Sequence, residues 1–137
     1  MKRTIAATTA CAGAALAASL LLTPALAHHS GAMFDAEVEL TLTGEVTRFD
    51  YLSPHSWLYV NVEHDDGTYT EWGFELGAPP LLRRAGVSPN FWQPGDAVTI
   101  KTNPLKDGRP AGSLSGAINA EGTTFGNASG LEPPAAE

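Results

Sequence analysis

The sequence predicts a mostly β protein: a small five-stranded antiparallel barrel with one short helix between its third and fourth strands, preceded by a cleaved signal peptide. Three observations predict this class. Apolar and polar residues alternate over several segments after residue 37, which is typical of half-buried strands. Turn-forming Gly, Pro and Asp residues separate these segments at short intervals. An uncharged apolar run precedes them near the N-terminus.

The first 27 residues have the features of a secretory signal peptide. Lys2 and Arg3 precede the apolar run, which spans residues 5–22, and the small-residue site Ala25-Leu26-Ala27 follows. We therefore expect cleavage after Ala27 and export to the periplasm. The mature chain would begin with a histidine, so that a free α-amino group lies beside an imidazole.

The mature chain of 110 residues has the length of one ordinary domain. We assign this domain to residues 28–125. Residues 126–137 are rich in Gly, Ala, Pro and Glu, and this composition predicts a disordered tail.

The composition of the mature chain excludes several classes of protein. The leader contains two basic residues and no acid, so the mature chain has 6 basic and 15 acidic residues and a net charge of −9. This charge argues against a nucleic-acid partner, because binding to phosphates requires clustered Lys and Arg. Cys11 lies in the leader, so the mature chain has no thiol. It also has no apolar run of the ~20 residues that a membrane span needs.

The order of the predicted elements favours an OB-like barrel. We predict one short helix at Pro79–Ala85 and strands at residues 38–51, 56–63, 68–76, 97–102 and 112–120. A break in the alternation predicts a bulge or sharp coil within residues 44–48. The order of three strands, one helix and two strands is that of the OB-fold. A plain antiparallel sandwich is the alternative.

Burial fixes the register of the predicted hairpin at Asp65-Asp66-Gly67. A three-residue loop with Gly67 in the left-handed conformation pairs Leu58 with Phe74, so that apolar residues share one face. The opposite face then carries His55, Trp57, Tyr59 and Asn61 on one strand, and Tyr69, Glu71, Gly73 and Glu75 on the other.

This second face is a candidate binding surface for a periplasmic protein or a small ligand. OB-folds place ligands on this part of the sheet. Its aromatic rings could stack on a sugar, and its rings and carboxylates together could hold a cationic group. The residues concerned are Trp57, Tyr59, Tyr69, Glu71 and Glu75. Cross-strand packing of the aromatic side chains is the structural alternative.

A second candidate site is a copper site at the mature N-terminus. His28 would supply an amine and an imidazole, His29 and His55 further imidazoles, and Met33 a thioether, which are donors that suit copper. In the structural alternatives, His28 and His29 follow the cleavage site without binding a metal, and His55 only forms a hydrogen bond with the backbone of its loop. Met33 and Phe34 would then anchor the N-terminal arm.

The sequence does not predict an enzyme. Glu71 and Glu75 are four residues apart, about 13 Å along a strand at ~3.3 Å per residue, which exceeds the carboxyl separation of glycosidases. Ser56 and His55 are neighbours on a strand and therefore point to opposite faces.

Most of the mature chain resembles an exported bacterial family known as domain of unknown function 6152. The matching motifs are Ala27-His28-His29-Ser30, Leu42-Thr43-Gly44-Glu45-Val46, Pro54-His55-Ser56-Trp57-Leu58-Tyr59, Trp72-Gly73-Phe74-Glu75-Leu76-Gly77, Leu81-Leu82-Arg83-Arg84-Ala85-Gly86, Pro94-Gly95-Asp96 and Lys106-Asp107-Gly108. The resemblance implies an exported small β-barrel without an assigned activity.

The chain is also remotely similar to the small periplasmic OB-fold copper chaperones of copper and silver efflux systems. Those proteins bind the metal with His and Met beneath a Trp. Here His55 and Trp57 share one face of a strand, and Met33 is the one methionine of the mature chain. The similarity implies a copper site with Trp57 as a neighbour of the metal.

Mass spectrometry of the exported protein tests the N-terminus. We expect the mature polypeptide to begin at His28, because Ala27 completes the cleavage site. A polypeptide that begins at any other residue would remove the terminal amine and imidazole pair from the copper hypothesis.

Overall fold

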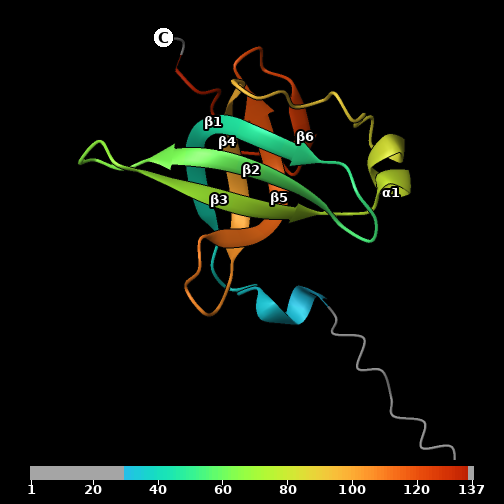
Figure 1. Cartoon of the computed structure of the whole chain (residues 1–137), viewed down its shortest axis with the longest axis horizontal. Coiled ribbons are helices and arrows are strands. Elements are labelled where there is room, and N and C mark those ends of the chain that lie inside the picture. Colours follow the sequence, from blue (N-terminus) through green and yellow to red (C-terminus); the bar gives the residue numbers. More distant parts are fainter. Residues whose placement is uncertain (1–29, 136–137) are drawn as a thin grey trace, which may run out of the picture.

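The computed structural model describes residues 30–135, so the leader, His28 and His29 lie outside the described residues. Within them the elements follow the order shown in Figure 1. They are a 3-10 helix (Ser30–Met33), β1 (Leu40–Asp50), β2 (Ser56–Glu63), β3 (Tyr69–Leu76), α1 (Pro79–Arg84), β4 (Ala97–Pro104), β5 (Ala111–Asn119) and β6 (Thr124–Gly126).

Strands β1 to β5 form a closed barrel, which confirms the predicted fold class. β1 pairs antiparallel with both β2 and β4, β2 pairs with β3, and β4 pairs with β5. A parallel pairing of β3 with β5 closes the barrel. In Figure 1, β2 and β3 cross in front of β4 and β5, and α1 lies at one end.

The register of the β2–β3 hairpin agrees with the prediction. Leu58 is opposite Phe74, and Val60 is opposite Trp72. Gly67 adopts a φ of 79° in the turn, a conformation that glycine adopts without strain. The irregularity expected in β1 is a bulge between Val46 and Arg48.

The core lies inside the barrel and extends under α1. Phe74, Leu58, Val46 and Ile100 are fully buried. Leu82 from α1 and Trp92 from the following loop join the same cluster, so the segment after β3 closes one end of the core. Residues 88–92 form a tight turn in which the Phe91 amide donates to the Ser88 carbonyl.

The segment after β5 differs from the disordered tail expected for residues 126–137. Gly126 belongs to β6, the Asn127 amide donates to the Ser115 carbonyl at 2.8 Å, and Leu131 is buried. The Lys101 ammonium, itself buried, donates to the Ser129 carbonyl at 2.6 Å. The composition of residues 126–137 does not predict this packing, because the contacts are with strands that are distant in the sequence.

The N-terminal arm is anchored on the opposite side of the barrel. Phe34 is buried and forms a β-bridge with Leu105. The Asp35 amide donates to the Pro104 carbonyl at 2.8 Å, and the Lys106 amide donates to the Met33 carbonyl at 3.0 Å. These bonds fix the arm, including the 3-10 helix, next to the turn between β4 and β5 (Figure 1).

Gly44 allows β1 to pair with two neighbours at once, with Val62 of β2 and with Val98 of β4. A Cβ atom on Gly44 would lie 2.1 Å from the Asn61 carbonyl oxygen. Only a residue without a side chain fits this close approach of two backbones.

Gly44→Ala is therefore expected to lower the free energy of unfolding by about 2 kcal/mol or more, since backbone must move to relieve the clash. Urea unfolding of the mature protein measures the change. Gly31→Ala is the matched control, because a Cβ atom at that position meets nothing within 4 Å. An equal effect of the two variants would contradict the proposed constraint.

Candidate functional site

A pocket of about 250 Å³ opens beside the first residues of β2. Its walls come from the N-terminal arm, from the ends of β2 and β3, and from β5. The lining residues are Gly31, Phe34, His55, Glu75, Leu76, Gly77, Ser113 and Leu114. The pocket thus combines an imidazole and a carboxylate with largely apolar walls.

His55 is held in place by the buried residue that follows it. The Ser56 side chain is fully buried, and its hydroxyl donates to the Leu52 carbonyl at 3.2 Å. The Ser56 amide donates to the Gly77 carbonyl at 3.3 Å. Since side chains alternate along a strand, the His55 ring is directed to the outer face. The preceding peptide bond between Ser53 and Pro54 is cis.

The His55 ring and the Glu75 carboxylate form the central contact of the pocket. Nδ1 of His55 contacts Oε1 of Glu75 directly. The His55 side chain is 39% exposed, whereas the Glu75 side chain is only 7% exposed. Oε2 of Glu75 is buried and has no hydrogen-bond partner within residues 30–135. Nε2 is the ring nitrogen of His55 that the contact with Glu75 leaves unengaged.

Glu75 is buried because of a strand pairing that is distant in sequence. The parallel pairing of β3 and β5 places Glu75 next to Ser113, and Phe34 of the arm lines the same pocket. The expectation that Glu75 lies on an exposed binding face is therefore wrong. The β2–β3 register places His55 diagonally across from Glu75, and this signal could have identified the pair from the sequence.

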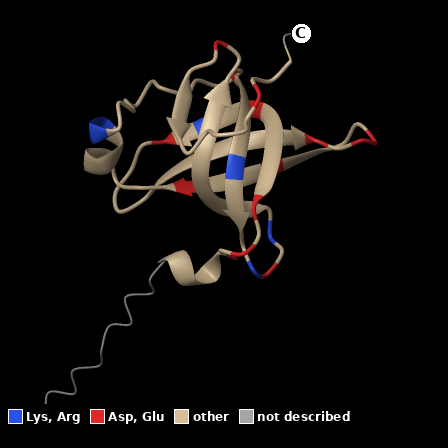
Figure 2. Cartoon of the chain, turned by 180° about the vertical axis from the view of Figure 1, so that it is seen from behind, with Lys and Arg blue, Asp and Glu red and all other residues tan. Residues whose placement is uncertain are grey.

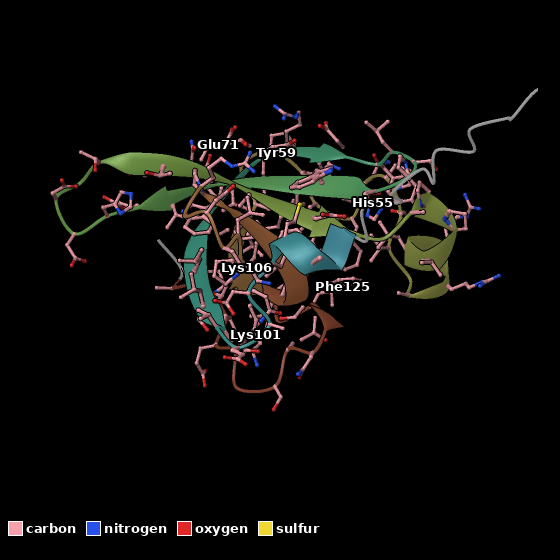
Figure 3. All side chains as sticks on the ribbon, turned by 90° about the horizontal axis from the view of Figure 1, so that it is seen from below. His55, Tyr59, Glu71, Lys101, Lys106 and Phe125 are labelled. Carbon is pink, nitrogen blue, oxygen red and sulfur yellow. The ribbon has the colours of Figure 1, made fainter. Side chains whose placement is uncertain are left out.

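Of the other predicted metal ligands, Met33 is the one that lies within the described residues. Met33 is 42% exposed and does not line the pocket. His28 and His29 lie outside the described residues, but Gly31 lines the pocket. The Lys106 ammonium donates to the Ala32 carbonyl at 3.1 Å, which helps to fix the arm there. Figure 3 shows His55 at the start of β2, beside the 3-10 helix.

The predicted aromatic face is present, but several of its groups already have protein partners. The rings of Trp57 and Tyr59 are stacked, with centroids 6.4 Å apart. They also lie over Gly73, where a Cβ atom would be 3.3 Å from the Tyr59 ring. The Arg48 guanidinium lies 3.8 Å from the centroid of the Tyr59 ring. Contacts with Tyr59 and then with Asp50 raise the pKa of Arg48, which keeps this cation charged.

The acidic residues of this face do not form a pair. Thr47 donates from its hydroxyl to Oε2 of Glu71 at 2.8 Å, whereas Glu75 contacts His55. Figure 3 shows Glu71 well along the sheet from His55, with Tyr59 between them. Tyr69 is 62% exposed near the hairpin turn. The two carboxylates thus belong to separate environments.

No group of three or more His, Cys, Asp and Glu side chains that could hold a metal ion occurs within residues 30–135. His64 hydrogen-bonds Thr70 at 2.8 Å in the β2–β3 hairpin, away from the pocket. A metal at the pocket would therefore need donors besides His55. An imidazole nitrogen is a donor type that suits ions such as copper and zinc, and His55 is the one described residue of the pocket lining that offers it.

Charged side chains on the described surface are scattered. Figure 2 shows the basic segments apart from one another, on α1, on the sheet and in the turn between β4 and β5. In the part of the chain that is described, no helix has both the length and the apolar character needed to cross a membrane.

The barrel topology and the pocket define a small OB-like β-barrel. The chain belongs to the family described as "Family of unknown function (DUF6152)", whose model matches residues 15–115. No curated protein matches the chain. A solved structure of the mitochondrial single-stranded DNA binding protein Rim1 from S. cerevisiae is similar, with 9% identity and a TM-score of 0.44. The similarity covers 60% of this chain and 93% of that chain.

Proposed function

We propose that this chain is an exported, periplasmic, non-enzymatic protein that binds a transition metal, with copper as the best candidate. His55, His28 and His29 would supply the nitrogen donors. One observation carries the proposal: Gly31 and His55 line the same pocket. The described part of the arm therefore reaches the pocket at Gly31, beside the one imidazole among the described residues that line it.

The distances allowed by the chain agree with this arrangement. Leu105 and Lys106, which directly follow β4, hold residues 32–34 of the arm in place next to Gly31. His29 and His28 precede Gly31 by two and three residues. An extended chain spans up to ~3.6 Å per residue, so both histidines have their Cα atoms within about 11 Å of Gly31.

The chemistry of the donors favours copper over a harder ion. A terminal amine and imidazoles are nitrogen donors, and these suit Cu(II) more than Mg²⁺ or Ca²⁺. The mature chain has no thiol, and Met33 is too exposed in its present position to line the pocket. We therefore assign the site to His28, His29 and His55, with Met33 as a donor only if the arm moves.

An interaction module that uses the Trp57 and Tyr59 surface is the alternative function. Its support is the partial exposure of these two rings on the sheet. It is the weaker candidate, because its groups already have partners in the protein. The Arg48 guanidinium lies over the Tyr59 ring, and Thr47 donates a hydrogen bond to Glu71. Glu75 is buried and contacts His55.

Cu(II) titration of the mature protein tests the metal site. We compare a protein that begins at His28 with one that carries a single additional glycine, which separates the amine from the histidine. We expect the extension to weaken binding by ~10-fold or more, equivalent to about 1.4 kcal/mol. Loss of the donor nitrogen in His55→Ala should have an effect of similar size.

His64→Ala is the matched control, because His64 bonds Thr70 in the hairpin and lies apart from the pocket. This variant should bind Cu(II) as the parent protein does. Equal affinity of the extended and unextended proteins would exclude the terminal amine. Equal affinity of His55→Ala and the parent would exclude the pocket.

A further inference from the structure

Glu75 has no role in the donor set assigned above, although it is the most buried ionisable group of the pocket. Its side chain is only 7% exposed. A carboxylate at such a position is costly unless it is hydrogen-bonded or paired. Glu75 has one partner, the Nδ1 atom of His55, and its second oxygen is buried without a hydrogen bond inside residues 30–135.

We infer that Glu75 is a positioning residue: its carboxylate holds the proton of the His55 ring on Nδ1 and thereby presents Nε2 to a metal ion. The inference rests on the proposed metal-binding function. It adds a residue to the site that does not touch the metal but determines which nitrogen binds it.

The geometry supports this role over that of a direct ligand. Oε1 contacts Nδ1, so a metal ion has no room between these two atoms. A carboxylate accepts hydrogen bonds and cannot donate one when ionised. The contact therefore requires a proton on Nδ1, and the lone pair of a neutral ring is then on Nε2. Histidines that bind metals are commonly oriented in this way by a carboxylate on the other ring nitrogen.

The fold makes this orientation rigid. His55 is fixed by the burial of Ser56 and by its hydroxyl bond to the Leu52 carbonyl. Glu75 belongs to β3. It pairs with Trp57 of β2 on one side and with Ser113 of β5 on the other. Both members of the pair thus lie on paired strands or directly beside them, so the fold fixes their backbone positions relative to each other.

The surroundings strengthen the interaction between the two groups. Phe34, Leu76 and Leu114 line the pocket, and apolar walls lower the local dielectric constant, so a hydrogen bond to a charged group is stronger there than in water. Among the described residues that line the pocket, no basic side chain other than His55 faces the carboxylate. The negative charge of Glu75 is therefore directed to the imidazole, which raises its strength as a metal donor.

Nitrogen-15 NMR of the metal-free mature protein tests the inference without any metal. The spectrum is recorded on the alkaline plateau, where the His55 nitrogen shifts no longer change with pH and the ring is neutral. We expect the His55 ring to carry its proton on Nδ1. In Glu75→Met, which removes the acceptor, the Nε2-protonated form that predominates in free imidazole side chains should become the major one.

Cu(II) affinity provides the second readout. Loss of such an outer partner commonly weakens metal binding by ~10 to 100-fold, and we expect this for Glu75→Met. Glu75→Gln keeps an oxygen acceptor for Nδ1 but removes the charge, so it should retain the proton on Nδ1 and show a smaller loss of affinity. Glu71→Gln is the matched control, because Glu71 bonds Thr47 and not His55; it should change neither readout.

The outcomes separate the inference from the proposed function. A parent protein whose His55 ring is protonated on Nε2 would overturn the inference, as would an unchanged ring in Glu75→Met. If Glu75→Met does not fold, the spectra of the parent protein and of Glu75→Gln still test the inference, because both should show the His55 proton on Nδ1. If the ring responds as expected but the parent protein binds no Cu(II), the positioning contact stands and the metal-binding function fails.

Discussion

The parallel pairing of β3 with β5 is the constraint on which both the barrel and the pocket depend. Gly73, Phe74 and Glu75 pair with residues 111–113, and this contact closes the sheet. The same segment buries Phe74 in the core and places Glu75, which is also buried, in the lining of the pocket. In the β2–β3 hairpin alone, the Glu75 carboxylate would be exposed to solvent. In the closed barrel it is buried and contacts His55. The pairing of these three residues therefore both closes the barrel and places Glu75 at the site.

The arm before β1 completes this arrangement from the other side. Phe34 is buried against the barrel and bridges to Leu105, and Gly31 lines the pocket. Burial of a Phe side chain contributes roughly 2 to 3 kcal/mol, which offsets part of the conformational entropy lost when the arm is ordered. The arm therefore reaches the wall of the pocket that contains His55, the one pocket histidine found among the described residues.

Much of the fold could be predicted from the sequence, because its determinants are local. The alternation in β2 and β3, Gly67 in the turn and the break in β1 each report on residues close in sequence. Burial of Glu75 and the packing of residues 127–131 could not be predicted in the same way. Both depend on contacts with β5 or β4, and nothing in the local pattern specifies those partners. The site residue that the sequence interpretation misplaced, Glu75, is the one that a distant strand covers.

Pulsed electron paramagnetic resonance of the Cu(II)-loaded protein that begins at His28 tests the central claim most directly. Copper bound through Nε2 of an imidazole shows a coupling to the remote ring nitrogen, which for His55 is the Nδ1 atom held by Glu75. We predict that the coupling contributed by one imidazole disappears in His55→Ala while the couplings from His28 and His29 remain, and that His64→Ala retains all of them. Identical spectra for the parent protein and His55→Ala would show that the metal does not bind at this pocket.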